Sequence, residues 1–170
     1  MEKTTGRLYW ITGLAGAGKT TIGTALYQRL RETKANVIML DGDKLHWAYG
    51  DDFGYTKEER RKASFITVRL CNILTSQGID VVCCQIAMFD VIRAWNRANN
   101  EKYTEVYLKV SMETLMKRDK KGLYSSRAEN LVGITMNMEE PKNPDVLIHN
   151  DGQERVEDIV ERILLKANSE

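Results

Sequence analysis

Apolar and β-branched residues gather in five short runs along the chain, at residues 7–12, 36–41, 79–86, 104–110 and 145–150. Runs of this length and composition are typical of strands that are buried on both faces of a sheet. The segments between and after them look helical, and they cover residues 19–33, 57–77, 90–100, 112–118 and 153–167. This alternation predicts an α/β fold, with a five-stranded parallel sheet and helices on both of its faces.

The segment 57–77 shows a clear helical pattern. Its side chains at spacings of three and four are Ile66, Leu70, Ile73, Leu74 and Gln77. A stripe of this kind is the face that a helix turns towards the core of its domain. We therefore expect these five residues to pack against the sheet.

Length and composition fit one compact domain that spans residues 1–170. Hydrophobic residues make up 42% of the chain, which is enough for a substantial core. The 25 Lys and Arg residues are balanced by 24 Asp and Glu residues, so that the formal charge is +1. This balance argues against a general polyanion binder, and we expect no nucleic-acid partner.

No stretch of the sequence reaches the roughly 18 apolar residues that a membrane span needs, and the first residues lack the apolar core of a signal peptide. We therefore expect a soluble, cytoplasmic protein without a membrane partner. Cys71, Cys83 and Cys84 fit buried, reduced thiols in such a compartment. Because Cys83 and Cys84 are neighbours in a strand, their side chains should lie on opposite faces of the sheet. The two histidines are too few for a zinc site.

A glycine-dense stretch, GLAGAGKT at residues 13–20, stands between the first strand and the first helix. It matches G-x-x-x-x-G-K-[ST] at every fixed position, in the strand–loop–helix context of a phosphate-binding P-loop. Glycines allow backbone N–H groups to point at a phosphate, and the following helix adds the positive end of its dipole. The residues expected to hold the ATP phosphates are Gly13, Ala15, Gly16, Ala17, Gly18, Lys19, Thr20 and Thr21.

Two of these residues have more specific tasks. Lys19 should reach the β- and γ-phosphates and take part in catalysis, and the Thr20 hydroxyl is placed to bind Mg²⁺.

The second strand ends in Asp41-Gly42-Asp43, and the carboxyl ends of strands face the ligand crevice in such a sheet. One carboxylate could organise Mg²⁺, and the other could accept the proton of an attacking hydroxyl. The same three residues could instead form a turn that caps the next helix.

The polar segment RDKKGLYSSRAEN, residues 118–130, carries much charge and shows weak periodicity. In a compact domain, a segment of this kind is commonly a functional loop or a lid. Cations that close over the γ-phosphate would stabilise the charge that spreads over its oxygens during transfer. Arg118 is the cation of this segment that we expect at the ATP phosphates, although a solvated basic loop would have a similar composition.

The chain resembles the adenylylsulfate (APS) kinase family over about residues 6–165. The resemblance is carried by the P-loop and by LDGD, FGYTKEER, KRDKKGLY and NPDVLI, in the order and spacing of the family. It implies a P-loop kinase fold with a mobile lid, and ATP and Mg²⁺ as cofactors. It also implies transfer of the γ-phosphoryl group to the 3′-hydroxyl of a small-molecule nucleotide that bears a 5′ mixed anhydride. A homodimer is expected as well, because the family is commonly dimeric.

Residue roles follow from the same resemblance. Asp43 would be the catalytic base, with Asp41 beside it near the metal, and Phe53 would line the pocket for the acceptor base. The residues expected to bind the acceptor are Asp41, Asp43, Phe53, Arg60, Asp90, Arg93, Lys121 and Leu123. The aromatic residues between positions 47 and 55 could stack on a nucleobase or pack in the core.

Three stretches depart from the family pattern, and all of them bear on the acceptor. The sequence RKASFI follows KEER, where the family has an asparagine and a further arginine. Asp90 stands where the family has the arginine of a Ser-Pro-x-Arg turn, and His46 replaces the arginine of DGD-x-x-R. Several cations are therefore missing near the acceptor, and one carboxylate is gained.

These departures favour an acceptor that is less anionic than APS or that has a different base. A phosphoramidate offers an N–H₂ donor that could meet Asp90, whereas a sulfate offers only oxygen acceptors. The chain thus resembles a branch of the family in bacterial capsule pathways that phosphorylates cytidine diphosphoramidate. Three alternatives stay open: an APS kinase that makes 3′-phosphoadenylylsulfate, a nucleotide-binding module without catalysis, and a kinase for another acceptor such as an aminoglycoside, a shikimate-like alcohol or a nucleoside monophosphate.

Overall fold

The computed structural model describes residues 4–119, 122–126, 131–134 and 136–169. Its strands are β1 (Arg7–Gly13), β2 (Val37–Asp41), β3 (Asp80–Cys84), β4 (Lys102–Lys109) and β5 (Val146–His149). They form one sheet in the order β2-β3-β1-β4-β5, and all neighbouring strands are parallel. The predicted five-stranded parallel sheet is therefore confirmed. Its central strand, β1, is the strand that leads into the P-loop.

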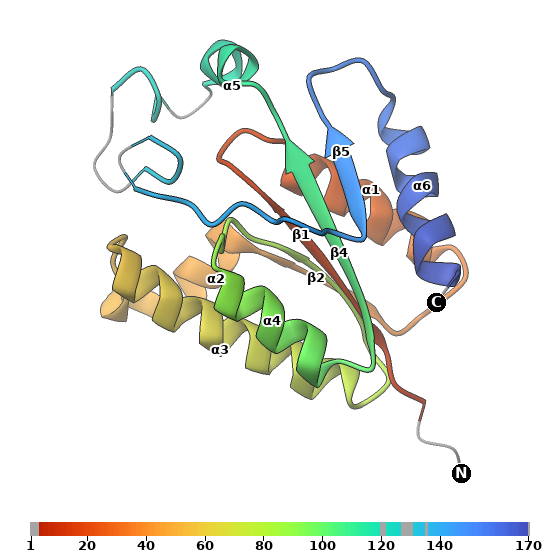
Figure 1. Ribbon diagram of the computed structural model, residues 1–170. Helices are drawn as coiled ribbons and strands as arrows, with labels where there is room; N and C mark the ends of the chain where they lie inside the picture. Colours follow the sequence, from red (N-terminus) through yellow and green to blue (C-terminus); the bar gives the residue numbers. More distant parts are fainter. Residues whose placement is uncertain (1–3, 120–121, 127–130, 135, 170) are drawn as a thin grey trace.

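Helices cover both faces of this sheet (Figure 1). α1 (Lys19–Arg31) and α6 (Val156–Asn168) lie together on one face, and α3 (Lys57–Thr75) and α4 (Asp90–Asn99) lie together on the other. The shorter helices are α2 (Gly42–Tyr49), the 3-10 helix η1 (Gly50–Asp52) and α5 (Met112–Arg118). The prediction lacked α2, because a helix of eight residues with only Leu45 buried is too short to show a helical period.

Two apolar cores lie on the two sides of the sheet. One joins the sheet to α1 and α6 and contains Cys84, and the other joins it to α3 and α4 and contains Cys83. The predicted opposite orientation of these neighbours is thus confirmed. All three cysteines are buried and free, as expected. Burial raises the pKa of Cys84 to about 12, so that its thiol stays protonated and unreactive.

The face of α3 that packs against the sheet agrees only in part with the prediction. Ile66 and Ile73 are 40% and 55% exposed, and Gln77 is exposed beyond the end of the helix. The buried residues of α3 are Ser64, Thr67, Val68, Cys71 and Thr75. Their hydroxyls donate to backbone carbonyls of the same helix, for example from Ser64 Oγ to Arg60 O at 2.7 Å. Leu70 and Leu74 pack against the core as predicted. Because a bonded hydroxyl can be buried at little cost, apolar spacing alone placed the centre of the buried face too far towards Ile66 and Ile73.

The N-terminus of α3 is closed by a capping box. Thr56 Oγ1 accepts the N–H of Glu59 at 3.3 Å, and Glu59 Oε2 accepts the N–H of Thr56 at 3.1 Å.

Replacement of Thr56 by Ala should lower the free energy of unfolding by about 1 kcal/mol, as measured by urea unfolding. Replacement of Thr33 by Ala is the control, because its hydroxyl only donates to Leu30 O near a helix C-terminus. Equal losses in the two variants would contradict a special role for the cap.

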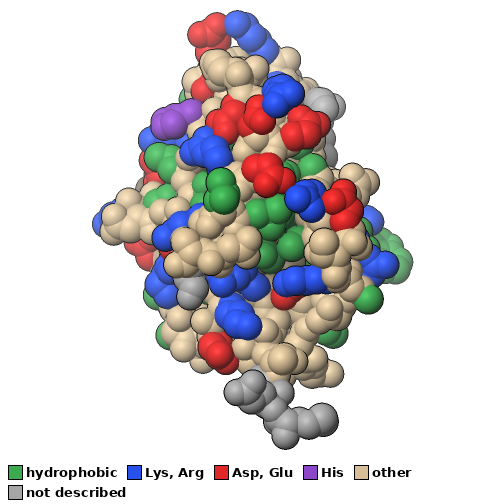
Figure 2. All heavy atoms as spheres, turned by 90° about the vertical axis from the view of Figure 1, so that its right-hand side faces the viewer, with side chains coloured by type: hydrophobic (Ala, Val, Ile, Leu, Met, Phe, Trp, Pro, Cys, Tyr) green, Lys and Arg blue, Asp and Glu red, His purple; other side chains and the backbone are tan. Residues whose placement is uncertain are grey.

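The surface carries charges of both signs. Figure 2 shows the face on the right of Figure 1, where acidic and basic side chains are interspersed and hydrophobic side chains appear between them. This mixture agrees with the formal charge of +1. Within the described ranges, no helix is both long and apolar enough to cross a membrane.

Candidate active site

The P-loop joins β1 to α1 at the carboxyl edge of the sheet. Gly16 and Gly18 have φ angles of 78° and 95°, in the left-handed region that favours glycine. Gly18 is the N-cap of α1, which begins at Lys19. The loop therefore leads directly into a helix N-terminus, which is the anion-binding arrangement that its sequence predicts.

Lys19 and Thr20 lie at the start of α1 and make two different contacts. Lys19 Nζ donates to Leu14 O at 2.8 Å, which holds the ammonium group at the loop. Thr20 Oγ1 donates to Asp41 Oδ2 at 2.7 Å and so joins α1 to the end of β2. A hydroxyl and a carboxylate at this spacing are hard oxygen ligands of the kind that Mg²⁺ prefers. The pair fits the predicted metal site.

The rest of a magnesium shell would come from the substrate. In the part of the chain that the structure describes, no group of three or more His, Cys, Asp and Glu side chains could hold a metal ion. Mg²⁺ in phosphotransferases usually binds one or two protein oxygens and takes its other ligands from phosphates and water. A site made by Thr20 and Asp41 is consistent with this arrangement.

Asp41 has a second contact through its other carboxylate oxygen. Oδ1 accepts the N–H of Asp43 at 3.0 Å, so that Asp41 is also the N-cap of α2. The capping turn, which was the alternative to a metal role, is therefore present beside the Thr20 contact. A Cβ atom on Gly42 would lie 3.3 Å from Cys84 O, so glycine allows this turn to lie close to β3. Asp43 is exposed on the first turn of α2, and its role as base stays a prediction.

The aromatic residues between positions 47 and 55 divide into different environments. The guanidinium of Arg60 lies over the Tyr55 ring, 5.1 Å from its centroid, and its Nε donates to Tyr55 O at 2.9 Å. His46 packs on the same ring, with 4.6 Å between the centroids. Phe53 contacts Tyr49 edge to face at 5.9 Å. Trp47 is 85% exposed, so core packing does not explain this residue.

Asp90 and Arg93 lie on α4, which starts close to the carboxyl end of β3. The Asp90 carboxylate accepts a hydrogen bond from the Arg93 guanidinium, and the two side chains are 60% and 7% exposed. Arg93 Nη2 also donates to Glu139 O at 2.6 Å, and Nε lies 3.9 Å from Glu105 Oε1 on β4. Arg93 Nη1 is buried and has no hydrogen-bond partner among the described residues. Arg93 therefore lies behind Asp90 as a buried cation.

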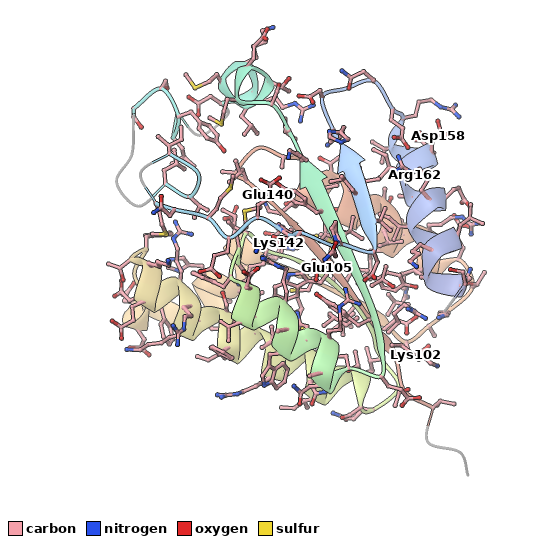
Figure 3. The ribbon with its side chains drawn as sticks, viewed as in Figure 1. Lys102, Glu105, Glu140, Lys142, Asp158 and Arg162 are labelled. Carbon is pink, nitrogen blue, oxygen red and sulfur yellow. The ribbon has the colours of Figure 1, made fainter. Side chains whose placement is uncertain are left out.

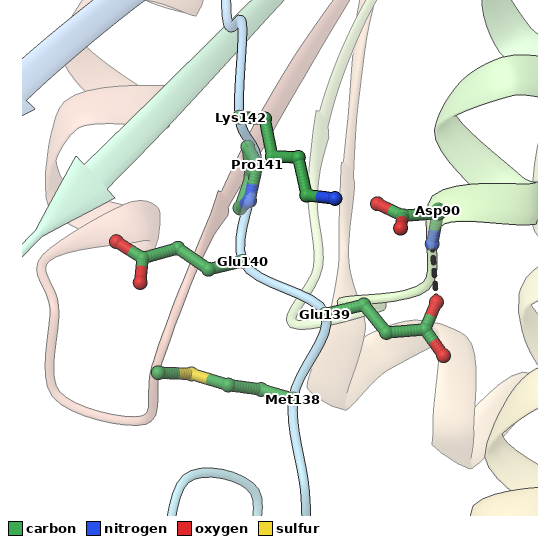
Figure 4. A pocket seen from close by; sticks show the side chains of 6 residues that line it. All are labelled: Asp90, Met138, Glu139, Glu140, Pro141 and Lys142. Atoms are coloured by element: carbon green, nitrogen blue, oxygen red, sulfur yellow. Dashed lines mark hydrogen bonds between the residues drawn. The ribbon is translucent and has the colours of Figure 1, made fainter.

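A cavity of about 480 Å³ lies between α4 and the segment that leads to β5. Its lining consists of Asp90, Met138, Glu139, Glu140, Pro141 and Lys142. Glu140 and Lys142 belong to the segment that crosses in front of the sheet in Figure 3. In Figure 4 the side chains of Asp90 and Lys142 point towards one another, whereas Glu140 points away from them. The cavity thus presents both an acid and a base between its walls.

Glu139 connects three parts of this region and was not predicted as a site residue. Its Oε2 accepts the N–H of Asp90 at 2.6 Å, and its own N–H donates to Met88 O at 3.1 Å (Figure 4). Its Oε1 lies 3.8 Å from Lys57 Nζ on α3. The sequence offers little signal for this role, because an acid in a loop is usually solvated and its partners lie about 50 or more positions away.

The described part of the lid packs on the P-loop. Tyr124 is 3% exposed, and it belongs with Leu14 and Leu115 to an apolar cluster against which Leu123 also packs. Arg118 Nη1 donates to Gly16 O at 3.4 Å, which places this cation beside the phosphate loop. Its contact with the ATP phosphates stays a prediction. Lys121, the other expected lid cation, lies outside the described residues. Mobility of the lid stays a prediction.

A parallel sheet with a P-loop after its central strand, and with acidic residues at the end of β2, defines the chain as a P-loop phosphotransferase. The family model described as adenylylsulphate kinase matches residues 5–149. The chain therefore belongs to the APS kinase family. It is a kinase that phosphorylates a hydroxyl group and uses ATP, as its relatives do.

Individual relatives differ in the acceptor that their names give. Cytidine diphosphoramidate kinase from Campylobacter jejuni is 36% identical over 163 residues, which cover 94% of this chain and 95% of the relative. A probable adenylyl-sulfate kinase from Archaeoglobus fulgidus is also 36% identical, over 150 residues that cover 86% and 97%. The Mycobacterium tuberculosis APS kinase in complex with AMPPNP and APS has a TM-score of 0.88 at 23% identity, over 97% of this chain and 99% of that one. At this identity the last likeness shows the fold alone.

Proposed function

We propose that the protein transfers the γ-phosphoryl group of ATP to the 3′-hydroxyl of cytidine diphosphoramidate, for the phosphoramidate modification of a capsule polysaccharide. The product would be cytidine 3′-phosphate 5′-diphosphoramidate. The C. jejuni relative carries the name of this acceptor, but the A. fulgidus relative is equally identical and carries the name of APS. The observation that favours the first acceptor is the pair of Asp90 and Arg93 beside the cavity.

This pair offers the groups that a phosphoramidate needs. The Asp90 carboxylate can accept a hydrogen bond from P–NH₂, and the Arg93 guanidinium can donate to a phosphoryl oxygen. Arg93 Nη1 is suited to this contact because it has no partner among the described residues. A sulfate carries only oxygen acceptors and therefore offers no donor to the Asp90 carboxylate.

APS is the second candidate acceptor, and Lys142 favours it. The Lys142 side chain points into the gap opposite Asp90, and an ammonium group there could bind a sulfate oxygen (Figure 4). Binding of cytidine diphosphoramidate would therefore depend mainly on Asp90, and binding of APS mainly on Lys142. Substitution of Asp90 separates them.

The catalytic roles proposed for the P-loop and the β2 end are the same for either acceptor. Lys19 would exchange its bond to Leu14 O for oxygens of the β- and γ-phosphates. Thr20 and Asp41 would hold Mg²⁺, which neutralises phosphate charge when bound. Asp43 would take the proton of the acceptor's 3′-hydroxyl while the oxygen of that hydroxyl bonds to the γ-phosphorus of ATP. The bond between the γ-phosphorus and the oxygen that bridges it to the β-phosphate would break, which leaves ADP.

Replacement of Asp90 by Arg should shift the acceptor preference from cytidine diphosphoramidate towards APS. The variant loses the acceptor for P–NH₂ and gains a cation for sulfate, so the ratio of the two kcat/KM values should fall by about 10- to 100-fold. Coupled assay of ADP release measures kcat/KM for both acceptors in both proteins. The unaltered protein should itself prefer cytidine diphosphoramidate.

Replacement of Glu157 by Arg is the matched control. It makes the same change of charge at an exposed position of α6, on the other face of the sheet from α4. Its acceptor ratio should equal that of the unaltered protein. If the ratio of the two kcat/KM values is unchanged in the Asp90 variant, or shifts equally in the control, Asp90 does not determine which acceptor is preferred.

A further inference from the structure

Four consecutive backbone carbonyls of the P-loop accept hydrogen bonds from side chains. The pairs are Leu14 O with Lys19 Nζ at 2.8 Å, Ala15 O with Tyr124 Oη at 2.5 Å, Gly16 O with Arg118 Nη1 at 3.4 Å, and Ala17 O with Asn150 Nδ2 at 2.8 Å. Three of these donors are more than 100 positions away from the loop. The outer side of the phosphate loop is therefore held by the C-terminal part of the chain.

Two of these bonds act on the peptide units that have the most freedom to turn. In a trans peptide unit, the carbonyl of one residue and the N–H of the next point in opposite directions. A bond to Ala15 O therefore fixes the N–H of Gly16, and a bond to Ala17 O fixes the N–H of Gly18. Both glycines have positive φ angles, and glycine has the fewest barriers to rotation on either side. These are the units at which an external hydrogen bond restricts the loop most.

Asn150 is itself firmly placed. Its backbone N–H donates to Lys109 O at 2.9 Å, at the end of β4. The next residue, Asp151, accepts the N–H of Ser111 at 3.0 Å through Oδ1. A Cβ atom on Gly18 would lie 2.6 Å from Asn150 Nδ2, so the approach of this side chain also requires glycine at position 18. Only the amide nitrogen can donate to a carbonyl, which settles the orientation of the Asn150 amide.

Tyr124 reaches the loop from the lid with a buried ring. The ring packs in the same apolar cluster as Leu14, and the side chain is 3% exposed. Burial, with a smaller contribution from Asp119, raises the pKa of Tyr124 to about 12. The hydroxyl is therefore protonated at any pH at which the enzyme works, and it remains a donor to Ala15 O.

We propose that Tyr124 and Asn150 are positioning residues for ATP. By holding the carbonyls of Ala15 and Ala17 outward, they turn the N–H groups of Gly16 and Gly18 towards the phosphates before the nucleotide arrives. Preorganised donors of this kind bind without the cost of ordering the loop. The inference rests on the binding of ATP by the P-loop and is independent of which acceptor the enzyme uses.

Replacement of Tyr124 by Phe and of Asn150 by Ala, singly and together, tests the inference. Each variant loses about one hydrogen bond, so KM for ATP should rise by about 3- to 10-fold, and by more in the double variant, while kcat changes less than about threefold. Calorimetric titration with AMPPNP, without any acceptor, should show the same losses. The inhibition constant of adenosine should stay unchanged, because adenosine has no phosphate for the N–H groups of Gly16 and Gly18 to bind.

Replacement of Tyr103 by Phe is the matched control, because it also deletes a buried hydroxyl. That hydroxyl donates to Glu105 Oε2 at 3.1 Å, and both residues lie on β4. It should leave the affinities for AMPPNP and adenosine unchanged. If the Asn150 variant does not fold, the Tyr124 variant decides the matter alone, since its ring is retained. Unchanged affinity for AMPPNP, or parallel losses for AMPPNP and adenosine, would overturn the proposal.

Discussion

Replacement of Lys19 by Ala is expected to lower kcat/KM for ATP by about two orders of magnitude or more. The ammonium group lies at the P-loop, where it donates to Leu14 O at 2.8 Å. Its loss removes a charge-assisted contact to the phosphates, at the place where negative charge develops during transfer. Coupled assay of ADP release with a saturating acceptor measures the change.

Lys102 provides the control for this substitution. It begins β4 at the opposite end of the sheet, and its Nζ donates to Thr5 O at 3.3 Å (Figure 3). Replacement of Lys102 by Ala removes the same side chain and should leave kcat/KM within about twofold of the unaltered protein. A Lys19 variant with activity as high as that of the Lys102 variant would mean that the P-loop is not the site of ATP.

Replacement of Asp43 by Asn is expected to separate binding from catalysis. Because the side chain keeps its size, ATP should bind with nearly the same Kd, which calorimetry measures. If the carboxylate takes the proton of the 3′-hydroxyl, kcat should fall by about 10²- to 10⁴-fold, which single-turnover assays measure directly.

Two further substitutions show whether the effect is specific to the Asp43 carboxylate. Asp51 is an exposed acid in η1, and its replacement by Asn should leave both quantities unchanged. Replacement of Asp41 by Asn should affect stability as well as catalysis, because Asp41 both accepts from Thr20 and caps α2. Nearly normal turnover in the Asp43 variant would show that another group, or none, accepts the proton.

The sequence predicts most of the fold because its strongest signals are local. The strands are continuous apolar runs, and the P-loop is a contiguous motif whose glycines have the conformations that the motif requires. The buried face of α3 could be predicted only in part, at Leu70 and Leu74. Its Ser and Thr residues are buried because their hydroxyls bond to the preceding turn, and hydropathy does not record such bonds.

The parts of the site that depend on distant contacts were the ones that sequence patterns missed. One is the bond from the N–H of Asp90 to Glu139, about 50 positions away, and the other is the bond from Asn150 to the P-loop, which spans 133 positions. Neither Glu139 nor Asn150 belongs to a motif, and both are polar residues in loops, where solvated side chains are common. The homodimer and the contacts of Lys121 stay predictions from the resemblance, and the cytoplasmic location stays a prediction from the sequence.

Phosphorus NMR of the product formed from ATP and cytidine diphosphoramidate identifies the reaction directly. The expected spectrum contains one new phosphomonoester signal that couples to the ribose H3′, the two signals of an intact diphosphoramidate, and ADP in equal amount. No new ester with this nucleotide, together with rapid conversion of APS under the same conditions, would contradict the proposed acceptor. A phosphoryl group found on any oxygen other than that of C3′ would contradict the proposed chemistry.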